Sequence, residues 1–272
     1  MRYIFRNLHV LFTDQLNNTI ELKTFPKRII SIVPSQSELL WDLGLREELV
    51  GITKFCIHPS QMFNSVERVG GTKTLNLEKI RALKPDLIIG NKEENEQSQI
   101  LELQKEFPVW MSDIYTLHDA LQMMEGIGAL VNKRQEAETI KSTIQTSFLN
   151  LPHKPQSVLY LIWNKPYMAA GKATFIGDML SKIGLQNVTS RASATDNMNR
   201  YPELSIEDIN ALNPDLIFLS SEPYPFKQEH MDELQQHLPA SKIILVDGEL
   251  FSWYGSRLAK SAAYFQELMR LI

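Results

Sequence analysis

Cys56 and His58 lie two positions apart and are the closest pair among the cysteine and histidine residues of the sequence. A bare zinc site needs three or four converging ligands. The remaining histidines show no spacing that supplies them; they are His9, His118, His153, His230 and His237. We therefore predict no resident metal ion. A metal would arrive inside its own chelate, where Cys56 or His58 either caps it from one axial side or remains a hydrogen-bonding loop residue.

The sequence also lacks the motifs that mark common catalytic centres. It contains no G-x-S-x-G nucleophile elbow, no H-E-x-x-H and no C-x-x-C. We predict a binding protein that is not an enzyme and has no covalently bound cofactor. The alternative from another class is an enzyme on a related fold, which would need a cluster of titratable side chains at its site.

Aromatic and basic side chains gather instead in segments that the sequence predicts to be loops. Trp163 and Trp253 both fall in such segments, whereas Trp41 lies among leucines in a predicted helix. A large flat ligand needs apolar faces to replace water, and each aromatic side chain buries about 150–250 Å². Arginines could meet carboxylate or amide oxygens at its rim. A loop aromatic can equally cover the core, so the gathering of several is the stronger signal.

The elements that would position these loops are indicated by a repeat. Residues 75–88 read LNLEKIRALKPDLI, and residues 204–217 read LSIEDINALNPDLI, with nine of fourteen positions identical. Each copy has a capping residue, an acidic first turn, apolar residues at helical spacing and a Pro-Asp stop. The apolar run that follows is typical of a central parallel strand. The sequence therefore predicts an α/β fold of two similar lobes with mostly parallel sheets and a ligand site between them.

Around the repeat, the patterns predict a hairpin near residues 9–23, strands at 28–33 and 49–52, and a helix at 36–43 that starts with a capping box from Ser35 to Glu38. Residues 54–74 are predicted to form a long loop. Residues 115–150 contain no proline and keep apolar residues at helical spacing. We expect one continuous helix there, roughly 50 Å long at about 1.5 Å per residue. The alternative is two helices broken near Gly126–Gly128.

The predicted division is an N-terminal lobe at 1–114, a connecting helix at 115–150 and a C-terminal lobe at 151–272. A net charge of −4 and a pI near 5.9 argue against a nucleic-acid partner. No apolar run reaches the roughly 20 residues of a membrane helix, so we predict a protein not embedded in a membrane. The first residues show no export signal. We expect either a cytoplasmic protein or one whose leader is absent.

The order and spacing of three stretches resemble one family. The stretches are PKRIISIVPSQSELLWDLGL, VGITKFCIHP and VGGTKTLNLEKIRALKPDLII. They resemble the helical-backbone (class III) substrate-binding proteins of ABC importers for vitamin B12, haem and ferric siderophores, and most closely the vitamin B12 branch. The resemblance covers the chain from about Phe12. It implies two Rossmann-like (chelatase-like) lobes joined by one long helix, and a monomer in the periplasm or cell envelope. It also implies an ABC permease and its ATPase as partners.

The resemblance further implies two docking residues. In the B12-binding proteins the glutamate of each N-L-E motif contacts arginines of the permease. These motifs read Asn76-Leu77-Glu78 and Ser205-Ile206-Glu207 here, so Glu78 and Glu207 inherit that role. Each glutamate could also simply complement a helix N-terminus.

The ligand-contact set implied by the resemblance and by the predicted loops comprises Phe55, His58, Thr72, Trp163, Tyr167, Tyr201, Phe251, Trp253, Tyr254 and Arg257. The chain departs from the B12 branch at Gly71-Thr72, where the family has a tryptophan, and at Asn91, where it can have an aromatic. The expected ligand is cobalamin, and the alternative is a ferric siderophore or haem.

Overall fold

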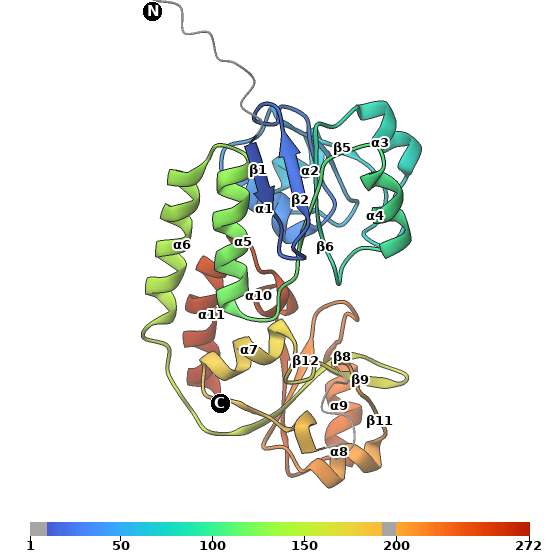
Figure 1. Cartoon of the computed structure of the whole chain (residues 1–272). Coiled ribbons are helices and arrows are strands. Elements are labelled where there is room, and N and C mark those ends of the chain that lie inside the picture. The colour runs from blue at the N-terminus through green and yellow to red at the C-terminus, as the bar shows by residue number, and fades with distance from the viewer. Residues whose placement is uncertain (1–9, 192–199) are drawn as a thin grey trace, which may run out of the picture. The chain divides into compact units, whose positions relative to one another are not determined.

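Both copies of the repeat form a short helix followed by a buried parallel strand in the computed structural model, which describes residues 10–191 and 200–272. In the first copy α3 (Leu77–Leu83) precedes β6 (Leu87–Asn91). In the second copy α8 (Ile206–Leu212) precedes β12 (Leu216–Ser220). The helix-then-strand prediction is confirmed in both places (Figure 1).

The predicted caps are present at both ends of each repeat helix. Asn76 accepts a hydrogen bond of 2.9 Å from the backbone N–H three residues on, and Ser205 accepts one of 3.1 Å in the same way. Each helix stops at a left-handed residue, Lys84 (φ 47°) or Asn213 (φ 43°), just before the proline. The proline removes a backbone donor and prevents the helix from continuing.

The aspartate of each Pro-Asp pair ties the end of its helix to the start of a neighbouring strand. The Asp86 carboxylate accepts the backbone N–H groups of Lys27 and Arg28, each at 2.8 Å. The Asp215 carboxylate accepts the backbone N–H of Ser157 at 2.8 Å and its hydroxyl at 2.7 Å. This shared structural task explains why the aspartate recurs in both copies.

The chain divides into two compact units. Unit 1 comprises residues up to Ile114, His118–Thr143 and Tyr254–Arg257, and unit 2 comprises Tyr115–Leu117, Ile144–Trp253 and Leu258–Ile272. Unit 1 therefore includes a short segment from near the C-terminus, which the sequence did not indicate. The lobe boundaries at 114 and 151 stay a prediction.

Unit 1 contains a five-stranded parallel sheet in the order β5-β4-β3-β6-β7. Its other strands are β3 (Ile29–Ser31), β4 (Leu49–Ile52), β5 (Glu67–Arg68) and β7 (Val109–Ser112). Ile80 of α3 and Leu103 of α4 (Gln97–Gln104) pack in one core cluster with Ile30 and Ile88 of the sheet. A separate antiparallel hairpin, β1 (Val10–Thr13) and β2 (Thr19–Leu22), confirms the predicted hairpin over its described residues.

Two local predictions in unit 1 are wrong. The capping box is absent: α1 (Pro34–Asp42) starts two residues earlier, after Val33, with Pro34 in its first turn and no side-chain cap. The predicted loop 54–74 contains α2 (Ser60–Ser65) as well as β5. Proline at a helix start needs no hydrogen-bonded N–H, which favours this earlier boundary.

Unit 2 contains a mostly parallel sheet in the order β11-β9-β8-β12-β13, with β10 also paired to β8. The strands besides β12 are β8 (Ser157–Trp163), β9 (Tyr167–Ala169), β10 (Gln186–Asn187), β11 (Glu203–Leu204) and β13 (Lys242–Val246). Its helices besides α8 are α7 (Phe175–Lys182), the short 3₁₀ helix η1 (Val188–Arg191), α9 (Gln228–His237), α10 (Gly248–Ser252) and α11 (Leu258–Leu271). Residues 192–199, between η1 and β11, lie outside the described residues.

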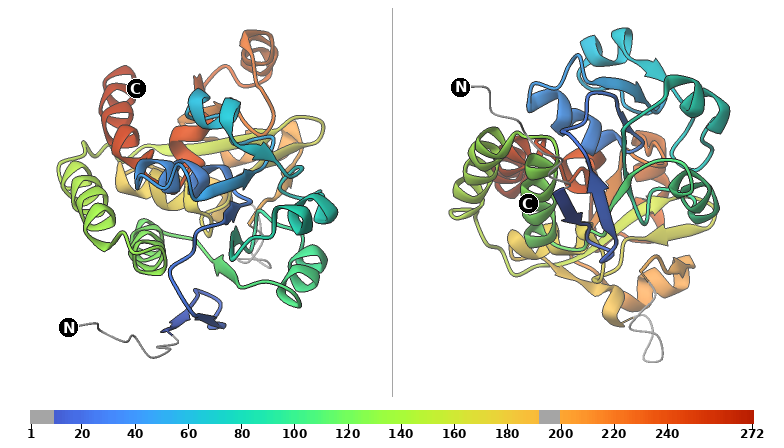
Figure 2. Two further views of the ribbon diagram at one scale, coloured as in Figure 1. Left: turned by 90° about the horizontal axis from the view of Figure 1, so that it is seen from above. Right: turned by 45° about the horizontal axis from the view of Figure 1, so that its top comes forward.

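The continuous helix predicted for residues 115–150 is two helices, α5 (Leu117–Leu130) and α6 (Arg134–Phe148). The chain turns at Asn132, which is left-handed with φ 57°. Gly128 lies inside α5, where a Cβ would stand 2.4 Å from the Cβ of Ala137. The glycine therefore allows the two helices to lie close together rather than breaking one helix (Figures 1 and 2).

Candidate functional site

Each parallel sheet has one place where the strand order reverses, between β3 and β6 in unit 1 and between β8 and β12 in unit 2. Open α/β sheets bind ligands beyond the carboxyl ends of their strands at such switch points. The loops that leave these strand ends are therefore the candidate site in each unit.

In unit 2, an exposed aromatic surface lies at the switch point. Trp163 ends β8 and is 42% exposed. Its ring meets the ring of Tyr224, from the loop after β12, edge to face with centroids 5.7 Å apart. Tyr224 is held in turn by Phe226, at 4.9 Å between centroids, and by a 2.9 Å hydrogen bond between its hydroxyl and Nε2 of His230. Trp163 was predicted, whereas Tyr224 was not in the predicted contact set.

Two other predicted tyrosines of unit 2 are partly buried. Tyr167 in β9 packs against the core of the unit, and this burial raises the pKa of its phenol. The ring of Tyr201 lies 5.6 Å from the guanidinium carbon of Arg200, which also lies 4.5 Å from the ring of Tyr115. Their contact with ligand stays a prediction.

Phe251 lies among other aromatic side chains of unit 2. Its side chain is completely buried. Its ring packs against Phe265, with centroids 4.7 Å apart, and against Tyr160, at 5.1 Å. Phe251 therefore contributes to the core of unit 2, and its contact with ligand stays a prediction.

Trp253 is 7% exposed, and its indole is tied to an acid that the sequence reasoning missed. The indole Nε1–H donates to Oε1 of Glu222 at 3.1 Å, and the Ser252 hydroxyl donates to the same oxygen at 2.6 Å. Burial raises the pKa of Glu222, outweighing these two hydrogen bonds. The only sequence signal was an acid between Ser221 and Pro223, directly after a buried strand.

Tyr254 and Arg257 belong to unit 1. The buried guanidinium of Arg257 donates from Nε and Nη2 to both carboxylate oxygens of Glu38, at 2.8 and 3.0 Å. A Cβ at Gly255 would lie 2.2 Å from the backbone oxygen of Ser35, so the segment lies directly against α1. Tyr254 is 6% exposed. The ligand contacts of Tyr254 and Arg257 stay predictions. The Arg257 guanidinium is already hydrogen-bonded to the Glu38 carboxylate.

Elsewhere in unit 1, Phe55 is the most exposed of the predicted residues, at 50%. The ammonium of Lys54 lies 5.0 Å from the centre of its ring. His58 and Thr72 are partly buried, and the Thr72 carbonyl accepts a hydrogen bond of 3.1 Å from the side chain of Asn95. Their contact with ligand stays a prediction too.

Cys56 is fully buried, and its sulfur lies 3.2 Å from the hydroxyls of both Ser37 and Thr53. Burial raises the pKa of its thiol. A protonated, enclosed thiol is a poor metal ligand. Across residues 10–191 and 200–272, no group of three or more His, Cys, Asp and Glu side chains could hold a metal ion.

A pocket of about 590 Å³ in unit 1 lies away from all of these residues. It is lined by the β1–β2 hairpin, by α5 and by polar side chains that include Asp14, Asp119 and Gln122. Asp14 is already satisfied by the backbone N–H groups of Leu16 and Asn18, at 2.9 and 2.7 Å. Most of the lining is polar, and its one aromatic residue, Trp110, is 2% exposed, so the pocket lacks an exposed aromatic face such as that of Trp163 or Phe55.

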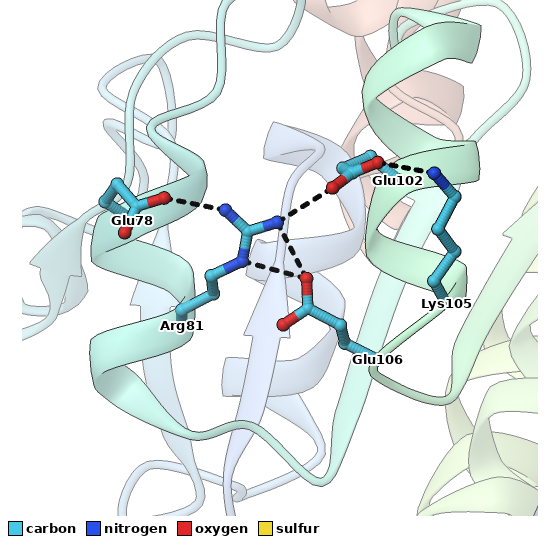
Figure 3. Close-up of polar contacts among 5 residues, drawn as sticks. All are labelled: Glu78, Arg81, Glu102, Lys105 and Glu106. Atoms are coloured by element: carbon cyan, nitrogen blue, oxygen red, sulfur yellow. Dashed lines mark hydrogen bonds and ion pairs between the residues drawn. The ribbon is translucent and has the colours of Figure 1, made fainter.

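The predicted docking glutamate of unit 1 lies in a network of charges, drawn in Figure 3. The side chain of Glu78 is 85% exposed, and its carboxylate accepts from Nη1 of Arg81 at 2.7 Å. Arg81 also donates to Glu106 at 2.8 and 2.7 Å and to Glu102 at 3.1 Å. Lys105 pairs with Glu102 at 2.7 Å. Hydrogen bonds to Glu106 and Glu78 raise the pKa of Arg81.

The corresponding glutamate of unit 2 has a different environment. Glu207 lies in the first turn of α8 and is exposed, like Glu78 in α3. Asn210 stands at the repeat position of Arg81, so no guanidinium is placed beside it. Within the described part of the chain, Glu207 has no hydrogen-bond or ion-pair partner. The docking roles of both residues stay predictions.

Comparison with known proteins identifies one family. The sequence model of the family described as periplasmic binding protein matches residues 29–243. The chain is 26% identical over 245 residues to a vitamin B12-binding protein of Pectobacterium carotovorum, covering 87% of this chain and 86% of that protein. It is 26% identical over 223 residues to the uncharacterised ABC transporter substrate-binding lipoprotein YvrC of Bacillus subtilis, covering 76% and 68%.

The fold is shared with solved structures. A possible iron-binding (periplasmic solute-binding) protein of Staphylococcus epidermidis superimposes with a TM-score of 0.74 at 23% identity, covering 90% of this chain and 99% of that one. At this identity the likeness concerns the fold alone. It confirms the predicted α/β class with mostly parallel sheets, apart from the break between α5 and α6. Over the described residues, no helix has the length and apolarity needed to cross a membrane.

Proposed function

The chain belongs to the periplasmic binding protein family, and from this premise we propose that it is the substrate-binding component of an ABC importer with a corrinoid as its ligand. The family consists of binding proteins rather than enzymes, in agreement with the prediction from the sequence. The similarity to a vitamin B12-binding protein extends over 87% of the chain and supports the choice of ligand.

The observation that carries the proposal is an exposed aromatic at the carboxyl end of each parallel sheet. Phe55, in the loop after β4, is 50% exposed, and Trp163, at the end of β8, is 42% exposed. Covering such large apolar side chains with a ligand is favourable, because it removes apolar surface from water. A macrocycle offers broad apolar faces that suit an aromatic surface of this kind, and we expect each aromatic to be covered on binding.

A ferric siderophore or haem is the second candidate ligand. Gly71 and Thr72 stand where the B12 branch has a tryptophan, and Asn91 stands where it can have an aromatic. The Asn91 side chain is buried and donates to the Ser112 hydroxyl at 2.9 Å, so it offers no stacking surface. Two missing surfaces would weaken the binding of a corrin more than that of a smaller chelate.

A titration of the purified protein with cyanocobalamin, hemin and a ferric siderophore decides between these ligands. We expect cyanocobalamin to quench tryptophan emission at micromolar concentration or below, since Trp163 lies at the proposed site. Quenching by hemin or the siderophore without any by cyanocobalamin would contradict the corrinoid assignment. Trp163→Phe keeps an apolar ring and should retain binding while losing most of the quenching.

The importer role also implies partners and a location. We infer that a permease with its ATPase accepts the ligand and that the protein works in the cell envelope, as family membership suggests. The exposed carboxylates of Glu78 and Glu207 are the proposed contacts with basic side chains of that permease.

A further inference from the structure

Glu222 stands at the switch point of unit 2, and no prediction from the sequence included it. It follows β12 by two residues, and β12 pairs in parallel with β8, which ends at Trp163. The same loop carries Tyr224, whose ring meets Trp163. A carboxylate and an exposed aromatic pair therefore leave neighbouring strand ends, where ligands bind in open α/β sheets.

The Glu222 side chain is fixed by its surroundings. Its Oε1 accepts hydrogen bonds from the Ser252 hydroxyl at 2.6 Å and from the Trp253 indole N–H at 3.1 Å. Gly248 leaves no room beside it, because a Cβ there would lie 2.6 Å from Cγ of Glu222 and 2.4 Å from Oγ of Ser220. The carboxylate thus holds the indole in place and is itself held against the start of α10.

The second oxygen of this carboxylate is available. Among the described residues, Oε2 of Glu222 has no hydrogen-bond partner, although each carboxylate oxygen can accept two hydrogen bonds. The charged and titratable groups that influence Glu222 are Asp247 and Glu249, from the loop after β13 and from α10, and Tyr160 of β8. A further titratable group lies beside Asp247, because the Tyr264 hydroxyl of α11 accepts a hydrogen bond of 2.9 Å from the backbone N–H of Asp247. The surroundings are acidic and favour a hydrogen-bond donor over an anion.

We propose that Glu222 recognises the ligand: Oε1 positions the Trp253 indole, and Oε2 accepts a hydrogen bond from a donor group on the ligand. This inference rests on the proposed function. It specifies the ligand chemistry, because a macrocycle with primary amides at its edge supplies such donors. A macrocycle with carboxylates at its edge would bring like charges together, which is unfavourable at short distance.

The test compares Glu222→Gln with Glu249→Gln. The glutamine at position 222 keeps an acceptor for Ser252 and Trp253 but presents an amide N–H₂ where Oε2 was. We expect it to weaken cyanocobalamin binding about tenfold or more, since a hydrogen bond to a charged group is lost. The Glu249→Gln variant removes one negative charge from the same neighbourhood and leaves the Glu222 carboxylate in place, and its affinity should stay within about twofold.

Affinity as a function of pH separates recognition from a purely structural role. Protonation of Glu222 places a donor on the carboxyl group, so binding by the unaltered protein should weaken as the pH falls through the pKa of Glu222. Burial raises this pKa above its ordinary value of 4.5, so the loss should begin above that pH. The Glu222→Gln variant should lack this step. Asp247, Glu249 and the two tyrosines are present in both proteins, so the comparison isolates the contribution of Glu222.

The outcomes are distinct. Unchanged affinity and an unchanged pH profile in Glu222→Gln would overturn the inference and leave the proposed function standing. An equal loss in both variants would overturn it too, because charge alone would then explain the effect. If the unaltered protein binds none of cyanocobalamin, hemin and the ferric siderophore, the proposed function itself fails. Near-ultraviolet circular dichroism checks that each variant is folded.

Discussion

Arg257 and Glu38 form a buried ion pair within unit 1, although 219 positions separate them in the sequence. Their side chains are 9% and 5% exposed. Two parallel hydrogen bonds give this pair a fixed geometry that a lysine could not reproduce. The pair holds the 254–257 segment on α1, so the loss of one partner would leave an uncompensated charge among buried groups.

We expect Arg257→Leu to lower the free energy of unfolding by about 3–5 kcal/mol, measured by urea denaturation at neutral pH. The double variant Arg257→Leu with Glu38→Leu should recover much of this loss, because no unpaired charge remains. A single variant as stable as the unaltered protein would show that the pair is solvated in solution. The free energy of unfolding of Arg257→Lys should lie between those of the unaltered protein and Arg257→Leu, since lysine keeps the charge and loses the paired geometry.

At the scale of elements, Gly128 decides how closely α5 and α6 pack. A helical glycine is normally about 1 kcal/mol less favourable than alanine. A Cβ at Gly128, however, would stand 2.4 Å from the Cβ of Ala137 and 3.1 Å from the backbone oxygen of Lys133. Neither neighbour is the end of a flexible side chain, so the helices would have to move apart.

We therefore expect Gly128→Ala to destabilise unit 1 by about 1–3 kcal/mol in thermal or urea unfolding, despite its better helix propensity. Gly126→Ala is the matched control in the same helix, where the added Cβ meets only the Trp110 ring, at 3.3 Å. Its effect should stay within about 1 kcal/mol of zero. An increase in stability for Gly128→Ala would mean that the contact between the helices is loose.

The helices and strands that the sequence predicted well are those with local signals. The caps at Asn76 and Ser205 and the Pro-Asp stops fixed α3 and α8, since each depends on residues only a few positions apart. The break at Asn132 carries no such signal: the apolar spacing continues through Val131, and no proline or glycine stands at the turn. The packing of α6 on α5 selects the left-handed conformation there, and that packing is not local.

The candidate site shows the same limit. Sequence position placed Trp163, Phe251 and Trp253 in loops or near them, but exposure separates them at 42%, 0% and 7%. Whether a loop aromatic faces water or the core depends on which distant elements pack over it, as Phe265 does over Phe251. Glu222 could not be identified from the sequence for a related reason. Its partners Ser252 and Trp253 lie about 30 positions away, at the end of α10, which the order of strands in the sheet brings next to it.

At the scale of the whole molecule, the two repeat copies carry a glutamate at the same position, but the two glutamates differ in their charged neighbours. Arg81 shares its charge among Glu78, Glu102 and Glu106 (Figure 3). Asn210 stands at the corresponding position of the second copy and leaves Glu207 without such a guanidinium partner. Surface ion pairs contribute little to stability. The consequence for docking is larger, because a basic side chain of a permease would compete with Arg81 for Glu78 and would find Glu207 unoccupied.

We expect Glu78→Lys combined with Glu207→Lys to abolish ligand uptake through the permease while cyanocobalamin affinity stays unchanged, since neither residue is in the proposed ligand site.

Among single variants, Glu207→Gln should reduce uptake more than Glu78→Gln, because Arg81 already offsets part of the Glu78 charge. Arg81→Gln should release Glu78 and strengthen binding to permease-containing vesicles, with a steeper dependence on salt. Glu267→Lys, which reverses an exposed charge on α11, should leave uptake as it is. Loss of ligand affinity in the double variant, or equal effects of the two single glutamine variants, would contradict unequal docking.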